Sequence, residues 1–148
     1  MKSIHDAGVR GDLIARISAL TGDSQRQWGK MNVYEMLKHN LAWEDMMWGR
    51  KVYKQVLIGK VFGKRALRSV LKDESPLSRN SPTVGDLKVK LATGDLEALK
   101  QEWIKGIAAY AQYNNPTFVH PFFGAMSHEQ IGYFVYKHAD HHLRQFGQ

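Results

Sequence analysis

The chain has 148 residues, a formal net charge of +7 and no cysteine. This length suits one domain, and 43% hydrophobic beside 24% charged residues is typical of a globular protein rather than a disordered one. Without cysteine, disulfides, thiolate zinc sites, iron–sulfur clusters and a cysteine nucleophile are excluded. A metal ion bound by side chains must therefore be held by nitrogen or oxygen.

Helical periodicity marks two segments in the first third of the chain. The first predicted helix centres on residues 13–20, where Leu13, Ile17 and Leu20 recur at the spacing of one helix face. The second opens at Asn32 and runs to about Tyr53. Asn32 followed three residues later by Glu35 resembles a capping box, which marks a helix start.

Two further helices are predicted in the last third. The third runs from about Asp95 to Tyr113, with Thr93 as a plausible N-cap. The fourth runs from about His128 to Gln145, and Ser127 with Gln130 forms a second capping box.

A long connection separates the second and third predicted helices. Residues 57–71 form a short amphipathic helix interrupted by Gly59 and Gly63, and residues 76–82 form a loop rich in serine and proline. No segment has the pattern of a strand. The sequence therefore predicts an all-α fold, a four-helix bundle in a single domain over residues 1–148, with one long crossover between helices 2 and 3.

The positive charge is concentrated in the segment 50–72, which contains no acidic residue. Its cations are Arg50, Lys51, Lys54, Lys60, Lys64, Arg65, Arg68 and Lys72. This stretch is either a solvated helix face or a site for an anionic partner or substrate. Nucleic acid is the less favoured partner, because the chain has no recognition-helix or base-reading motif.

No apolar run approaches the roughly 20 residues that a membrane helix needs. The first six residues also lack the apolar core of a signal peptide. We therefore expect a cytoplasmic protein with no membrane partner.

The histidines of the fourth predicted helix suggest a metal site. His138 and His142 are four residues apart, so both rings lie on one helix face, and they continue its apolar stripe. Two neighbouring buried imidazoles need partners, and a divalent cation satisfies them. The alternative is that these histidines only stabilise the negative end of the helix dipole.

His39, midway along the second predicted helix, is the obvious third ligand. Three protein ligands leave a coordination position for water or substrate, which is the pattern of a catalytic site. His141 is interpreted as supporting this group or exposed. His120 either rims the pocket or fills a turn, and the sequence leaves both interpretations open.

Several motifs together resemble the DinB/YfiT-like proteins, a bacterial superfamily, over essentially the whole chain. They are Trp28-Gly29-Lys30-Met31 followed by His39, His120-Pro121-Phe122-Phe123-Gly124, then Ser127 and Gln130, and the closing run His138-x-x-His141-His142-Leu143-x-Gln145-Phe146. The match is closest to an uncharacterised branch of that superfamily.

The resemblance implies a four-helix bundle with a divalent ion, zinc or nickel, held by three histidines. Carried over by position, these ligands are His39, His138 and His142. The resemblance also implies transfer of a low-molecular-weight thiol to an electrophilic substrate, or hydrolysis of a small substrate, and a homodimer. Trp28, Trp43 and Phe122 are candidates to line the pocket.

Three functional hypotheses follow. The leading one is a metal-dependent enzyme in which basic residues such as Arg50, Lys51 or Lys54 hold the carboxylates of a thiol cosubstrate. No general base is identified, since Glu44 and Asp140 are not placed by the pattern. The second is a non-catalytic module that binds anions or nucleic acid through the stretch 50–72. The third is a bundle whose metal only tightens packing.

Overall fold

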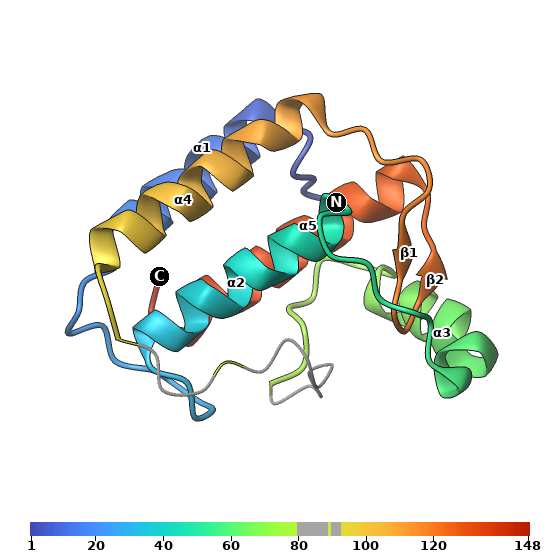
Figure 1. Cartoon of the computed structure of the whole chain (residues 1–148), viewed down its shortest axis with the longest axis horizontal. Coiled ribbons are helices and arrows are strands. Elements are labelled where there is room, and N and C mark those ends of the chain that lie inside the picture. The colour runs from blue at the N-terminus through green and yellow to red at the C-terminus, as the bar shows by residue number, and fades with distance from the viewer. Residues whose placement is uncertain (80–88, 90–92) are drawn as a thin grey trace.

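The computed structural model is mostly helical and describes residues 1–79, 89 and 93–148. Four helices run side by side (Figure 1): α1 (Ala7–Ser18), α2 (Val33–Met47), α4 (Leu96–Ala109) and α5 (His128–Gln145). The remaining elements are α3 (Leu57–Val70), a 3₁₀ turn (Tyr110–Gln112), β1 (Val119–His120) and β2 (Gly124–Ala125). The predicted all-α class is confirmed. Within the described ranges, no helix is long and apolar enough to cross a membrane.

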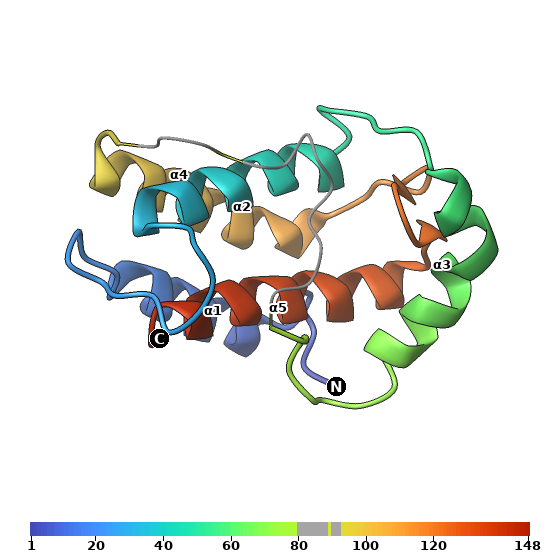
Figure 2. The ribbon, with the colours of Figure 1, turned by 90° about the horizontal axis from the view of Figure 1, so that it is seen from below.

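The four long helices form two layers. α2 and α4 make one layer and α1 and α5 the other, and α3 lies across one end of both (Figure 2). α1 packs on α4 and on α5, and α2 packs on α4. The histidine rings of α2 and α5 meet across the remaining interface.

The core lies between these layers and receives apolar side chains from each of the four helices. Fully buried examples are Leu13 and Ile17 of α1, Met36 and Leu37 of α2, Trp103 and Ile107 of α4, and Val135 and Leu143 of α5. Each helix thus buries one apolar stripe, as the sequence periodicity predicts.

Both predicted capping boxes are confirmed, and they fix where the two histidine-bearing helices begin. Asn32 Oδ1 accepts from the Glu35 amide at 2.8 Å, and Glu35 Oε2 accepts from the Asn32 amide at 2.8 Å. Ser127 and Gln130 make the same reciprocal pair at the start of α5. α5 therefore has the predicted bounds, residues 128–145.

Three predicted helix boundaries are wrong. α2 ends at Met47 rather than near Tyr53, because Gly49 takes a φ of 72°, which ends the helical path. α4 is capped by Asp95 rather than Thr93, since the Asp95 carboxylate accepts from the Ala98 amide at 3.0 Å. α4 itself ends at Ala109, and the 3₁₀ turn then covers part of the predicted continuation.

The expectation of no strand is also wrong in one small region. β1 and β2 form an antiparallel pair with Val119 opposite Ala125 and His120 opposite Gly124. Strands this short carry no readable alternation, so the sequence pattern could not reveal them. Of the predicted loop 76–82, residues 80–82 lie outside the described residues.

The long connection between α2 and α4 contains α3, close to its predicted range. α3 presses its glycines against the hairpin: a Cβ at Gly63 would lie 3.0 Å from the Phe123 Cα and closer still to the Phe122 carbonyl oxygen. At the other end of the helix, Lys137 of α5 donates from Nζ to the Val70 carbonyl at 2.6 Å. A cation at the last carbonyls of a helix also complements its dipole.

We expect Gly63→Ala to lower the free energy of unfolding by roughly 1–3 kcal/mol, because the added methyl group meets backbone atoms that cannot move independently. Chemical denaturation measures this change. Gly11→Ala in α1 is the matched control, since a Cβ there meets no atom within 4 Å. The control should gain roughly 0.5–1 kcal/mol from helix propensity. Equal responses of the two variants would contradict close packing of α3 on the hairpin.

Candidate metal centre

Three histidine rings converge between α2 and α5. His39, His138 and His142 each offer one ring nitrogen, and these nitrogens all lie within 4.8 Å of one another. The ring centroids are 4.7–5.4 Å apart. His39 and His142 are buried, with 4% and 7% of their surface exposed. The structure therefore brings together the three residues that the sequence analysis selects.

The local sequence explains this convergence. On α5 the spacing of four residues stacks His138 and His142 one turn apart on the side that faces α2. On α2, His39 shares the inner stripe with Met36 and Trp43, so helix packing turns its ring toward α5. The Trp43 ring stacks on His138 at 4.1 Å with an angle of 7° between the planes. This stacking fixes the plane of the His138 imidazole.

Burial keeps the two imidazoles of α5 neutral. Burial first, and then the neighbouring His39, lower the pKa of His142 to about 3. The pKa of His138 is held well below its usual value by burial first and then by His142 and His39. Neutral imidazole is the form that ligates metals, and no proton must be displaced near pH 7. The donor set and its protonation state therefore fit a divalent ion.

Gln145 controls the tautomer of His142. Its Oε1 lies 3.0 Å from His142 Nδ1, and its Nε2 donates to the Trp28 carbonyl at 3.0 Å. Because the second bond fixes which end of the amide is the oxygen, Nδ1 of His142 must carry the proton. The lone pair on Nε2 is then available to a metal, as in many histidine–metal sites. The sequence analysis quoted Gln145 only as part of a motif and gave it no role.

Of the three aromatic residues proposed for the pocket, only Trp43 touches a ligand histidine. Trp28 lies one layer further out, with its ring 5.5 Å from that of His141, which in turn lies 5.1 Å from that of His142. Phe122 packs instead beside the glycines of α3. His141 thus supports the group from its edge.

The ambiguity over His120 is resolved in favour of a turn. Its Nδ1 accepts from the backbone amides of Phe122 and Phe123 at 3.1 and 3.2 Å, which closes the loop between β1 and β2. Burial lowers its pKa to about 4, so the ring stays neutral and keeps this acceptor. His120 is not a member of the group that could hold a metal.

The carboxylates considered as general bases have other partners. Glu35 caps α2, and Asp140 forms an ion pair with Arg16 of α1 at 2.9 Å. Glu44 is buried on the side of α2 that faces α4, where its Oε2 accepts from Tyr110 Oη at 2.6 Å. Among the residues that the structure describes, the ligand group contains histidines alone.

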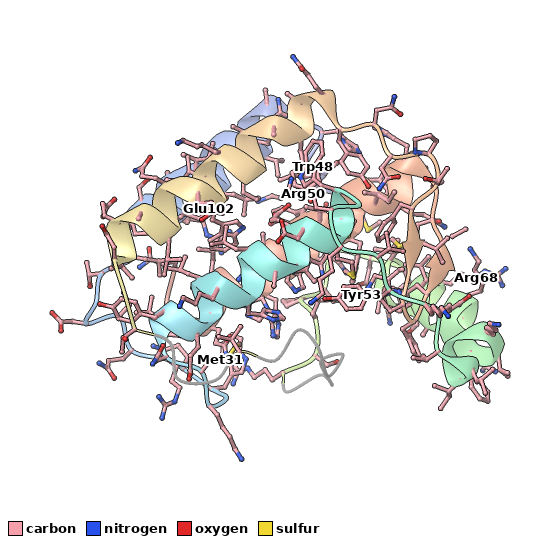
Figure 3. The ribbon with its side chains drawn as sticks, in the orientation of Figure 1. Met31, Trp48, Arg50, Tyr53, Arg68 and Glu102 are labelled. Carbon is pink, nitrogen blue, oxygen red and sulfur yellow. The ribbon has the colours of Figure 1, made fainter. Side chains whose placement is uncertain are left out.

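Glu44 borders a separate cavity of about 330 Å³ between α2 and α4. Trp48 and Arg50 lie at the end of α2 and Glu102 on α4, and all three line this cavity (Figure 3). Burial raises the pKa of Glu44 from 4.5 to about 7, although the Tyr110 hydrogen bond opposes the rise. Glu44 is therefore a buried acid of the α2–α4 interface.

The basic residues proposed to hold a cosubstrate do not lie in the histidine group. Arg50, Lys51 and Lys54 follow the end of α2, roughly 12 Å along the helix axis from His39. Arg50 forms an ion pair with Asp45 at 2.6 Å.

A further cavity, of about 470 Å³, lies beside Trp28 and is also lined by Arg16, Arg79 and Arg144. The Arg79 guanidinium lies 4.5 Å above the Trp28 ring.

These features define a helical protein with a buried three-histidine group between two antiparallel helices. Over residues 7–148 the chain matches the family described as "Protein of unknown function (DUF1569)", and it belongs to that family. No curated protein and no solved structure matches the chain.

We expect Gln145→Leu to weaken metal binding roughly 10–100-fold, because His142 loses the acceptor that holds its Nδ1 proton. Competition with a chromogenic chelator measures the affinity. Gln145→Glu is the comparison variant: it keeps an acceptor for Nδ1 but loses the donor to the Trp28 carbonyl, so it should bind metal more tightly than the leucine variant. Unchanged affinity in the leucine variant would contradict the positioning role.

Glu44→Gln should stabilise the protein above pH 7, where the native carboxyl must ionise in an apolar interface. The raised pKa, from 4.5 to about 7, corresponds to roughly 3 kcal/mol. The difference in the free energy of unfolding between variant and wild type should be absent below pH 4.5. It should grow between pH 4.5 and 7 and stay constant above pH 7. Denaturation at a series of pH values measures it, and a difference independent of pH would refute the assignment.

Proposed function

We propose that His39, His138 and His142 hold a divalent metal ion, zinc or nickel, and that the protein is a metal-dependent enzyme acting on a small molecule. The observation that carries the proposal is the convergence of three imidazoles, each offering a ring nitrogen within 4.8 Å of the others. Both metals accept imidazole nitrogen. Three protein ligands leave a coordination position for a reactant.

Two reactions suit such a site: transfer of a low-molecular-weight thiol to an electrophilic substrate, and hydrolysis of a small substrate. When bound, a divalent ion with three neutral ligands keeps its full charge and lowers the pKa of a coordinated thiol or water toward neutrality. Trp43 supports this chemistry by covering one side of His138 and excluding water from it.

An anionic cosubstrate would be held by arginines beside the histidine group. Arg79 and Arg144 line the cavity of about 470 Å³ next to Trp28, whose carbonyl is bound to Gln145 and so to His142. Arg16 in the same cavity is paired with Asp140. We assign the role first given to Arg50, Lys51 and Lys54 to Arg79 and Arg144, because a guanidinium binds a carboxylate in a bidentate manner.

The same proposal includes membership of the DinB/YfiT-like superfamily and its four-helix bundle. The helical class and the histidines at the positions that the resemblance selects support it. The same proposal includes a homodimer of single-domain subunits in the cytoplasm.

The test is elemental analysis of protein purified without an affinity tag. The wild type should carry about one equivalent of zinc or nickel per chain, and His138→Ala with His142→Ala should carry none. His128→Ala is the control, since His128 is exposed and pairs with His5 away from the group. Metal content unchanged in the double variant would remove the proposal.

The alternative function is a non-catalytic module that binds anions through the stretch 50–72. The observation in its favour is the exposure of Lys60, Arg65 and Arg68 on α3. The two functions differ in their dependence on the histidines. An enzyme would lose thiol transfer or hydrolysis in the double-histidine variant, whereas a binding module would keep its anion affinity.

A further inference from the structure

α3 exposes four large apolar side chains at its N-terminal half. Leu57, Ile58, Val61 and Phe62 are 80%, 61%, 72% and 56% exposed. Residues at this spacing lie on one side of a helix, so they form a continuous apolar face over the first two turns. α3 lies at one end of the molecule, across the ends of the other helices (Figures 1 and 2).

The packing of α3 holds this face outward. On the opposite side, Gly59 and Gly63 sit so close to the Phe122 backbone that a Cβ at either position would collide with it. Lys64 Nζ donates to the Ala125 carbonyl beside them. α3 cannot roll to bury its apolar face without giving up these contacts, so the exposure is a property of the fold.

Cations border the apolar face. Lys60, Lys64, Arg65 and Arg68 are exposed, and Figure 3 shows Arg68 extending from α3 away from the body of the molecule. Over the described residues, Lys60, Arg65 and Arg68 take part in no ion pair, and the whole segment 50–72 contains eight cations and no acid. The surface therefore combines exposed apolar area with uncompensated positive charge.

We propose that α3 docks on the surface of an anionic lipid bilayer. In this arrangement Leu57, Val61 and Phe62 enter the boundary between headgroups and acyl chains, as the apolar face of an interfacial helix does. Lys60, Arg65 and Arg68 lie at the level of the lipid phosphates, where each cation near an anionic surface adds to the affinity. The expectation of no membrane partner rests on the lack of an apolar run long enough to span a bilayer. Binding to the surface of a bilayer does not require a spanning helix.

The chemistry of the surface favours lipid over two other occupants. Nucleic acid would engage the cations through phosphates but would leave the four aliphatic and aromatic side chains without a partner. A second copy would place the same patch against itself in a two-fold contact, so the cations of one chain would face those of the other. An anionic bilayer satisfies both parts of the surface.

The experiment is flotation of the full chain with vesicles of phosphatidylcholine alone or mixed with phosphatidylserine, at low and high salt. The wild type should float with the mixed vesicles at low salt only. Val61→Ser with Phe62→Ser, which keeps every charge, should lose binding at least tenfold. Lys60→Glu with Arg65→Glu should also lose about tenfold or more, since two cations leave the surface.

The matched control is Lys38→Glu with Lys105→Glu, which makes the same change in net charge at exposed positions on α2 and α4. It should bind the mixed vesicles within about twofold of the wild type. Circular dichroism and the thermal midpoint establish that each variant is folded, and exposed substitutions should move the midpoint little.

Three results would overturn the proposal. One is a wild type that binds neither vesicle at low salt. Another is an equal loss in the control pair, which would mean that net charge alone acts. The third is a wild type that does not bind vesicles but binds duplex DNA or self-associates through Val61 and Phe62. That result would assign the surface to nucleic acid or to a second copy of the chain.

Discussion

The candidate site depends on placing three imidazole rings in the interface between α2 and α5. Each ring carries one donor and one acceptor, and each buried polar atom left without a partner costs roughly 1–3 kcal/mol. Trp43 offers His138 a stacking surface but no hydrogen bond, and Gln145 takes only one nitrogen of His142. An ion bound by the inward nitrogens would offset the cost of placing them there.

The two capping boxes contribute to the same interface. Each box fixes the first residue of its helix, and the apolar stripe then sets which positions face the neighbour. His39 lies seven residues after Asn32, and His138 lies eleven after Ser127, so each histidine is two to three turns from a fixed start. These local signals are why the three converging histidines could be predicted from sequence. Caps, periodicity and the spacing of four residues are local signals, and all three survive in the structure.

Other parts of the site depend on contacts that local patterns do not contain. The role of Gln145 requires the Trp28 carbonyl, which is 117 residues away along the chain. The burial of Glu44 against α4 depends on which helices become neighbours, and its partner Tyr110 is 66 residues away. The end of α2 depends on the backbone conformation of a single residue, Gly49, and the two-residue strands likewise depend on local backbone conformation. These features follow from tertiary packing, and the sequence pattern is compatible with several outcomes for each.

α3 and the histidine group are joined through α5. Lys137, which donates to the last carbonyl of α3, is the residue next to His138. Lys137 is 6% exposed, and burial lowers the pKa of its ammonium group. Its contact with the C-terminal end of α3 offsets the free-energy cost of burying this charge. This bond holds the C-terminal end of α3 to α5, which carries two of the three histidines, while the glycines of α3 pack on the hairpin that precedes α5. The outer face of α3 therefore has a fixed orientation relative to the site, because rigid backbone contacts connect them. A surface bound by α3 would meet the molecule at one end, with α1, α2, α4 and α5 extending away from it.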